Sequence, residues 1–291
     1  MNNSEIEKLL KQLIPNVNSN YYIECQGGGL TNNNYKVSIN NDCYVLRIIK
    51  KSSEKMINRL DECKNNKIAE KLGIDRSYFI IREDGTKLSK FLGDGTTLRD
   101  VDFKEEKILI KLCKELRKLH NSGEKFENKF SPIEIIIKYE NILKASNWVF
   151  YKDYLEIRKK IIKLLNLLSN IGVNEVPCHN DLVPENCIIH DEEISLIDWE
   201  YSGMNDFMWD LASFSIECEF NEEEDLKLLN TYFNGDIPSE YKMKLNIYKV
   251  LQDFIWSIWG NVKVIEGEEF SEYAFRRYDR CKHGIKNMKI N

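Results

Sequence analysis

Features that would assign a chain to a special class are mostly missing from these 291 residues. No stretch approaches the roughly 18 uninterrupted apolar residues of a membrane-spanning helix, and the amino terminus, Met1–Glu5, lacks the basic region and apolar core of a secretion signal. The 42 lysines and arginines are fewer than the 47 acidic residues and form no stripe, which argues against a nucleic-acid-binding surface. We therefore expect a cytoplasmic protein that neither inserts into a membrane nor binds nucleic acid.

Metal-binding and redox motifs are also missing. The eight cysteines include no C-x-x-C pair, and the four histidines form no cluster. Zinc and thiol-redox motifs therefore have little support. We expect free thiols that pack as small hydrophobic side chains in a reducing compartment.

The remaining composition is that of an ordinary globular chain, with 42% hydrophobic and 31% charged residues. Short β-like runs dominate the first part of the sequence and surround one helix, which is expected over residues 54–72. The β-like runs cover residues 21–25, 35–39, 44–49, 78–82 and 86–92. A capped helix ending at Pro15 precedes them, Gly27–Asn34 is expected to be a flexible loop, and Asn40-Asn41-Asp42 predicts a hairpin turn.

Helical periodicity dominates the rest of the chain. Helices are expected over residues 103–120, from Pro132 onward, over residues 151–171, and from residue 206 to the end. One β-like island at residues 176–198 interrupts them. This order predicts an α+β protein, in which a small antiparallel sheet with one helix precedes a larger, mostly helical part that contains a short hairpin.

The β island contains three polar residues whose order suits phosphoryl transfer from a nucleotide. That reaction needs a carboxylate that orients the acceptor hydroxyl and takes its proton, and oxygen ligands that hold magnesium against the phosphates. Asp181 lies in a loop, Asn186 lies where that loop ends, and Asp198 follows an apolar strand after a hairpin turn. The hairpin is expected to bring Asn186 and Asp198 together as metal ligands. Each residue alone is more often part of a turn or a cap, but their ordered combination is specific.

The same segment resembles a known family. H-N-D-x-x-x-x-N from His179 to Asn186, followed by I-D-x-E-Y from Ile197 to Tyr201, resembles the choline/ethanolamine kinases. Leu182–Glu185 and Trp199–Gly203 look most like their bacterial Lic-type choline kinases. The wider superfamily includes the aminoglycoside phosphotransferases and has the protein-kinase-like fold. The resemblance implies a bilobal fold, with a nucleotide-binding lobe at residues 1–90 and a catalytic and substrate-binding lobe at residues 91–291.

The resemblance also implies a nucleotide site in the first lobe. The phosphate loop of the family is matched by Gly28-Gly29-Leu30-Thr31-Asn32. Its nucleotide-binding strand is matched by Tyr44-Val45-Leu46-Arg47-Ile48. Arg47 stands where protein kinases usually carry lysine, and its permanent charge can hold two phosphate oxygens, although a plain surface cation would look the same. Glu62 is the candidate partner of Arg47, with Asp61 as the neighbouring choice. The strand Leu88–Leu92, which includes Phe91, is expected to pack on adenine.

A third set of residues suggests the acceptor. Trp256 and Trp259 lie three residues apart and share one face of a helix, which is also what core packing would produce. A quaternary ammonium donates no hydrogen bond from its nitrogen, so aromatic faces and carboxylates must recognise it. The resemblance places both tryptophans in the choline cage of the family, together with Tyr201 and Tyr273. Glu217 is a candidate counter-charge, although an acid on a helix is usually solvated.

The resemblance thus implies an ATP-dependent kinase with Mg²⁺ as cofactor, which phosphorylates the hydroxyl of choline to give phosphocholine and ADP. Asp181 would act on the hydroxyl, His179 would orient the catalytic loop by hydrogen bonding, and Asn186 and Asp198 would hold the metal. The alternatives are a kinase for ethanolamine, thiamine or an aminoglycoside, and a non-catalytic choline-binding sensor with a kinase-like shell. The complete set of three polar residues argues against the sensor.

Overall fold

The structure is a computed structural model that describes residues 3–15, 21–28, 32–40, 42–50, 56–93 and 95–288. The chain packs into two compact units. The first combines Met1–Asp102 with Glu185–Ser202, and the second combines Phe103–Pro184 with Gly203–Asn291. These packing units differ from a single cut after residue 90, because a hairpin late in the sequence joins the first unit. The predicted division into a nucleotide-binding and a catalytic lobe at that residue stays a prediction.

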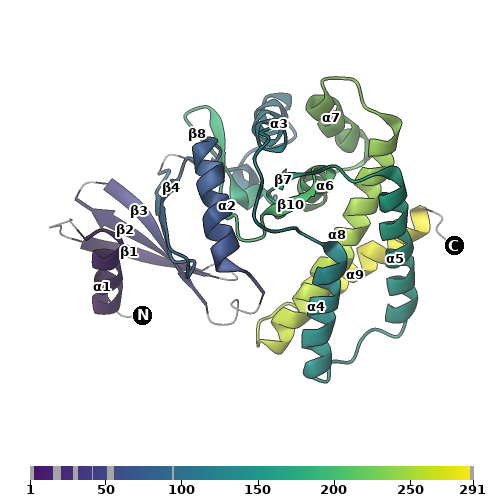
Figure 1. Cartoon of the computed structure of the whole chain (residues 1–291), viewed down its shortest axis with the longest axis horizontal. Helices are drawn as coiled ribbons and strands as arrows, with labels where there is room; N and C mark the ends of the chain where they lie inside the picture. Colours follow the sequence, from purple (N-terminus) through teal and green to yellow (C-terminus); the bar gives the residue numbers. More distant parts are fainter. Residues whose placement is uncertain are drawn as a thin grey trace. The chain divides into compact units, whose positions relative to one another are not determined.

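The first unit is built on a five-stranded antiparallel sheet with the strand order β1-β2-β3-β5-β4 (Figure 1). Its strands are β1 (Tyr21–Gly28), β2 (Asn32–Ile39), β3 (Asp42–Ile49), β4 (Tyr78–Ile81) and β5 (Lys87–Lys90). Tyr35, Val37 and Ile39 of β2 are buried at alternate positions, and they pack with the apolar face of α1 (Asn3–Leu13). This alternation is what a strand with one covered face requires.

The hairpin predicted at Asn40-Asn41-Asp42 is confirmed. β2 and β3 pair in antiparallel register with Ile39 opposite Asp42. Asn40 has a φ of 54°, a left-handed conformation that asparagine tolerates better than most residues.

The described residues of the loop predicted from Gly27 to Asn34 are strand instead. Gly28 pairs with Asn33 in the ladder between β1 and β2, so the two strands extend far into the glycine-rich segment. Residues 29–31, which include the predicted phosphate-loop residues Gly29 and Thr31, lie outside the described part of the chain. Glycine and asparagine have low strand propensity, but strand propensity depends strongly on context, and the ladder overrides it here.

The first unit also contains α2 (Arg59–Lys71), which begins later than the predicted residue 54. Asn58 caps the helix, because its Oδ1 accepts the backbone N–H of Leu60 at 3.1 Å. Arg59 and Glu62 lie three residues apart in the first turn, on one side of the helix.

A three-stranded antiparallel sheet of order β6-β8-β9 completes the first unit. Its strands are β6 (Thr96–Thr97), β8 (Cys187–His190) and β9 (Glu193–Leu196), with short 3-10 turns at Leu98–Asp100 and Pro184–Asn186. The β8–β9 hairpin was predicted, and β6 was not. The backbone N–H of Leu196 donates to the carbonyl of Ile74 at 3.0 Å, and that of Arg76 donates to Ser195 Oγ at 2.9 Å. These bonds join the hairpin to the segment after α2.

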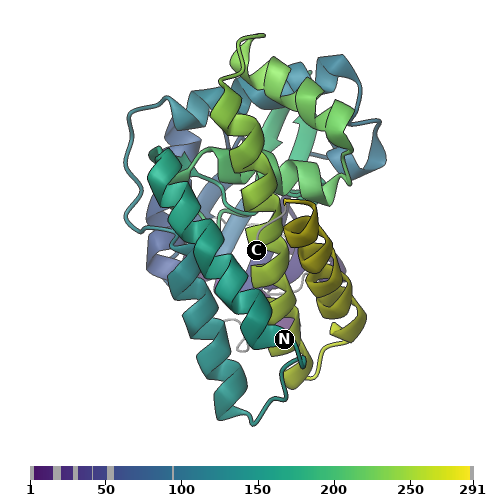
Figure 2. The same ribbon diagram turned by 90° about the vertical axis from the view of Figure 1, so that its right-hand side faces the viewer.

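The second unit is mostly helical, as predicted. Its helices are α3 (Glu106–His120), α4 (Pro132–Ala145), α5 (Tyr154–Ile171), α6 (Met208–Glu217), α7 (Glu222–Phe233), α8 (Ser239–Ile265) and α9 (Ser271–Asn287). A two-stranded antiparallel sheet pairs β7 (Glu175–Cys178) with β10 (Gly203–Asp206), and β10 was not predicted. Nearly every residue of α8 from Lys244 to Lys263 is buried, so this helix is the centre of the unit. Figure 2 shows α8 in light green between the teal helices α4 and α5 and the yellow α9, all three of which it contacts.

The structure also describes most of the cysteines and the helices that were considered for membrane crossing. The cysteines whose side chains are described are free, and all of them except Cys43 are buried, as expected for small hydrophobic residues. No helix among the described residues has the length and apolar character needed to cross a membrane.

Candidate active site

The first unit contains a pocket of about 280 Å³ between β3, β5 and the β8–β9 hairpin. Its lining includes apolar side chains of Val45, Phe91, Leu92, Ile188 and Ile197 and the charged groups of Arg47, Lys87 and Asp198. Such a pocket suits a flat apolar group that carries an anionic tail. The pocket thus brings the predicted nucleotide residues Arg47 and Phe91 to the predicted metal ligand Asp198. Leu88 does not line it, because its side chain is fully buried in the core against α1.

Arg47 is buried and held from three sides. Its Nη1 lies 3.0 Å from Asp198 Oδ1, its Nη2 donates to Glu62 Oε1, and Nη2 also donates to the carbonyl of Gly85 at 3.0 Å. Burial opposes the charge, but the carboxylates of Glu62 and Asp198 raise the pKa of Arg47 above its usual value. Asp61, the neighbouring choice of partner, instead accepts a hydrogen bond from Asn58. A role of Arg47 and Glu62 in nucleotide binding stays a prediction.

The predicted phosphate-loop residue Asn32 is also buried. Its Nδ2 donates to Glu200 Oε2 at 3.2 Å, and Arg59 Nη1 lies 3.0 Å from the same oxygen. Burial and the charge of Asp198 raise the pKa of Glu200 to about 7, whereas Arg59 acts in the opposite direction. No role was predicted from the sequence for Arg59 or Glu200. The only sequence signal for Glu200 was its place in the I-D-x-E-Y motif.

The two predicted metal ligands lie at adjacent ends of the β8–β9 hairpin. The carbonyl of Asn186 accepts the backbone N–H of Ile197 at 2.9 Å, next to Asp198. Asp198 has a φ of 64°, in the left-handed region, and its side chain is one third exposed. An amide and a carboxylate are hard oxygen donors of the kind that magnesium prefers, so the residues present fit this metal. Tyr201, which follows in the same segment, is half-buried in the first unit.

The second unit carries the loop of Asp181, and this loop is anchored to α6. Both oxygens of Asp210 accept backbone N–H groups: Oδ2 from His179 at 2.8 Å and Oδ1 from Asn180 at 2.7 Å. Asn180 has a φ of 66°, and its Oδ1 accepts a hydrogen bond from Asn205 at 2.9 Å. The N–H of Asp181 donates to His179 Nδ1 at 3.4 Å. The loop backbone is therefore fixed, and the partly exposed Asp181 side chain projects from it.

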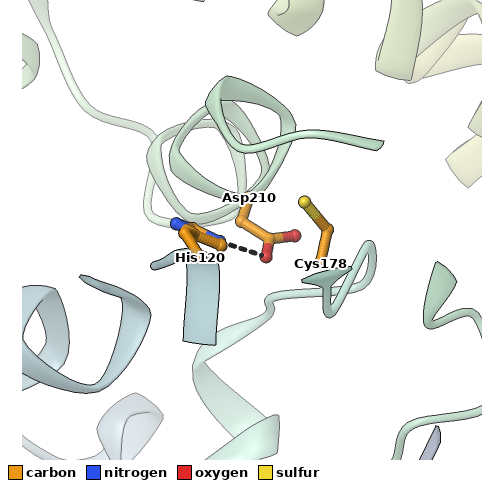
Figure 3. Close-up of side chains that lie close together, drawn as sticks. All are labelled: His120, Cys178 and Asp210. Carbon is orange, nitrogen blue, oxygen red and sulfur yellow. Dashed lines mark hydrogen bonds and ion pairs between the residues drawn. The ribbon is translucent and has the colours of Figure 1, made fainter. Parts of the chain in front are cut away.

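Asp210 belongs to a buried polar cluster with His120 and Cys178 (Figure 3). The donor atoms of His120, Cys178 and Asp210 lie within 4.8 Å of one another. His120 Nε2 is 3.1 Å from Asp210 Oδ2, and its Nδ1 is 2.8 Å from the Tyr232 hydroxyl. Burial raises the pKa of Cys178 well above its usual value, and the thiol donates to the carbonyl of Asn205. Both ring nitrogens and both carboxylate oxygens are engaged, so the cluster is a hydrogen-bonded support and a poor metal site.

The predicted cage residues of the second unit contact one another. The ring of Trp259 on α8 lies 6.0 Å from that of Trp256 and 6.0 Å from that of Tyr273 on α9, at angles of 90° and 74°. Both tryptophans are buried. Burial raises the pKa of Tyr273 to about 12, Arg277 opposes this rise, and the carboxylates of Glu217 and Asp181 add to it. Glu217, the predicted counter-charge, forms an ion pair with Arg277.

Arg277 links this aromatic group to buried acids. Its guanidinium lies 5.0 Å from the centre of the Tyr273 ring, and its Nη1 is 3.1 Å from Asp253 Oδ1. Arg277, Asp210 and His120 were not predicted from the sequence. Each is an ionisable residue within an otherwise apolar helix face, which must find a buried partner, and this pattern is visible in the sequence.

The antiparallel sheet with its basic pocket and the helical unit that carries the Asp181 loop match the protein-kinase-like fold. Residues 23–234 match the family model of choline/ethanolamine kinase, and the chain belongs to this family. The protein LicA of Haemophilus influenzae is 32% identical over 261 residues, which cover 87% of this chain and 76% of that protein.

Solved structures agree with this assignment. The choline kinase LicA from Streptococcus pneumoniae is 35% identical with a TM-score of 0.86, and the match covers 97% of this chain and 99% of that one. A LicA structure in complex with AMP is 34% identical with a TM-score of 0.82 and covers 98% and 96%. The predicted family and the α+β kinase-like fold are confirmed.

Proposed function

We propose that this protein is an ATP-dependent choline kinase that gives phosphocholine and ADP. The observation that carries the proposal is the match to the choline kinase LicA, which extends over 97% of this chain at a TM-score of 0.86. The chain keeps a carboxylate, an amide and a second carboxylate at Asp181, Asn186 and Asp198, which are the groups that the reaction needs. The use of ATP and the free thiols favour the cytoplasm as its compartment.

In this proposal the first unit binds the nucleotide. Adenine packs between Val45 and the apolar side chains of the hairpin, with Phe91 at the edge. Arg47 neutralises the phosphates, and Gly28, Gly29, Thr31 and Asn32 are the proposed phosphate-loop residues by their resemblance to the family motif. The AMP bound to a LicA relative supports a nucleotide in this family. When bound, Mg²⁺ would offset charge on the phosphate oxygens, and Asn186 and Asp198 would hold it.

In this proposal the second unit binds the acceptor, choline. Asp181 orients the choline hydroxyl and takes its proton, while His179 supports the loop backbone. The trimethylammonium group packs against Trp256, Trp259 and Tyr273 as a cation–π ligand. Tyr201 and Glu217 are further candidates for this substrate site. Because Glu217 is already paired with Arg277, its charge acts on the ammonium at reduced strength.

The test is steady-state ATP turnover with a panel of acceptors, namely choline, N,N-dimethylethanolamine, ethanolamine, thiamine and an aminoglycoside, each with and without Mg²⁺. We expect the highest kcat/KM for choline, with a decline as methyl groups are removed from nitrogen. Phosphorus NMR identifies the product, and Asp181→Asn is the matched inactive control. A higher kcat/KM for another acceptor would reassign the substrate. Choline binding without any turnover would favour the sensor.

A further inference from the structure

The carboxylate of Glu62 is shared by two arginines. Its Oε1 accepts from Arg47 Nη2, and its Oε2 accepts from Arg59 Nη1 at 2.7 Å. Arg59 is the first residue of α2 and lies one turn before Glu62. Both arginines and Glu62 are more than nine-tenths buried, so water does not replace either partner. The orientation of Glu62, and therefore of Arg47, depends on both guanidinium groups.

Arg59 makes a second set of contacts with segments far along the chain. Its Nη1 lies 3.0 Å from Glu200 Oε2, and its Nη2 lies 3.5 Å from Asn32 Oδ1. Asn32 Nδ2 closes the triangle by donating to Glu200 at 3.2 Å. Arg59 therefore connects α2 with the first residue of β2 and with the segment that follows Asp198.

Arg59 also packs against the turn that holds Arg47. A Cβ added to Gly85 would lie 2.6 Å from Arg59 Cδ, so the turn and the arginine stem are in close contact. The carbonyl of Gly85 is a hydrogen-bond acceptor for Arg47. The stem of Arg59 thus supports this carbonyl, while its guanidinium supports the carboxylate that pairs with Arg47.

Arg59 supplies one of the two cations that face the three carboxylates of this network, Glu62, Glu200 and Asp198. Arg47 and Arg59 face Glu62 and Glu200 in a buried environment. Without Arg59, Glu62 and Glu200 would share Arg47 as their nearest cation, and one buried carboxylate would lose its partner. Arg47 would then shift away from the position in which it meets Asp198 at 3.0 Å.

We propose that Arg59 is a positioning residue for the phosphate end of the nucleotide site. It holds Glu62 and the Gly85 turn so that Arg47 stays beside Asp198, and it holds Asn32 at the start of β2. Its role rests on the proposed function, because the phosphates of ATP are the group that Arg47 meets there. With its Nη1 engaged by two carboxylates, Arg59 acts through Arg47 and does not itself bind phosphate.

The test compares Arg59→Met and Arg59→Lys with the wild-type protein in two assays. Turnover gives KM for ATP, KM for choline and kcat, and calorimetry gives Kd for a non-hydrolysable ATP analogue. Losing charge-assisted contacts that position Arg47 should raise KM and Kd for the nucleotide about tenfold in Arg59→Met, with a smaller change in KM for choline. For Arg59→Lys, KM and Kd for the nucleotide should lie between those of the wild type and of Arg59→Met, because an ammonium carries the charge but lacks the planar set of donors of a guanidinium. Arg158→Met, which breaks an ion pair with Glu140 in the second unit, should leave nucleotide affinity unchanged.

The double variant Arg59→Met/Glu200→Gln separates positioning from simple charge balance. The amide removes the unpaired charge and helps the protein to fold. The positioning role predicts that weak nucleotide binding persists in this variant, because Glu62 still lacks its second partner. Recovery of wild-type affinity would overturn it, as would unchanged affinity in folded Arg59→Met or equal losses for choline and ATP. If the wild-type protein phosphorylated no acceptor, the proposed function would fail, and analogue binding would still test Arg59.

Discussion

Asp210 accepts the backbone N–H of Asn180 at 2.7 Å, and this bond ties the loop of Asp181 to helix α6. The same carboxylate accepts the N–H of His179, so one buried side chain fixes two consecutive peptide units. Asn180 adopts a left-handed conformation directly before Asp181, and the anchor stabilises that bend. The placement of Asp181 therefore depends on a residue that lies beyond the β10 strand.

Replacing Asp210 tests this anchor. Asp210→Asn leaves one oxygen for two N–H donors, so the free energy of unfolding should fall by about 2 kcal/mol and kcat should fall more than KM for ATP rises. Urea unfolding and steady-state kinetics measure both. Asp225→Asn is the matched control, because Asp225 is also a buried acid, paired with Ser215 and Lys249. This control should lose stability but keep kcat, and an equal kcat loss in both variants would contradict the anchoring role.

The proton-accepting role of Asp181 predicts that Asp181→Asn lowers kcat by at least ~100-fold, the lower range for acid–base assistance. Because the substitution is nearly isosteric and the side chain is partly exposed, the melting temperature should stay within error of the wild-type value. Near-normal turnover in the folded variant would remove Asp181 from the mechanism.

The metal assignment predicts strict dependence on a divalent cation. Asp198→Ala should abolish turnover, since a methyl group cannot replace a carboxylate ligand. EDTA should stop the wild-type enzyme, and added Mg²⁺ should restore it. The proposed site would be wrong if turnover persisted in excess EDTA.

The aromatic side chains of Trp256 and Trp259 predict a loss of affinity that is specific to choline. Trp256→Leu or Trp259→Leu keeps apolar volume but removes a π face, and one desolvated cation–π contact of ~2 kcal/mol corresponds to roughly a thirtyfold rise in KM for choline. KM for ATP should change little. Phe254→Leu controls for packing, because Phe254 is buried on the same helix and stacks on Tyr154. Tryptophan variants that fold and keep wild-type choline affinity would reduce these residues to core packing.

Asp75 predicts a pH-dependent contribution to stability. Burial opposes ionisation, but Lys87 and hydrogen bonds from Ser77 and Asn66 lower the pKa of Asp75 below its usual value. The contribution is therefore complete above the ordinary carboxyl pKa of about 4 and is lost as pH falls through the lower, folded-state value. At about pH 7 the free energy of unfolding of Asp75→Asn should be lower than that of the wild type. Urea unfolding should show this difference becoming smaller toward about pH 3. A difference in the free energy of unfolding that did not change with pH would exclude the charge of Asp75 as its cause.

Much of the local structure could be predicted from the sequence. The spacing of Leu109, Leu112, Leu116 and Leu119 predicted α3, and all four are buried. The asparagines after Ile39 predicted the hairpin between β2 and β3. Residues 27–28 and 32–34 were predicted wrongly as part of a loop, because intrinsic propensity favours a turn there while pairing with a neighbouring strand extends the ladder.

Some features of the candidate site could also be predicted from the sequence, and others could not. The order of Asp181, Asn186 and Asp198 along the chain indicated phosphoryl transfer, because that chemistry requires a carboxylate and oxygen ligands for magnesium, and the order resembles the motif of a kinase family. The buried ion pairs and hydrogen bonds that surround these groups could not be predicted from the spacing of residues along the chain. Arg59 meets Glu200 from 141 residues away, and His120 meets Asp210 from 90 residues away. Local periodicity reports which face of an element is covered, whereas a buried charge is stabilised by whichever distant segment packs against it, so these pairings were decided only when the chain folded.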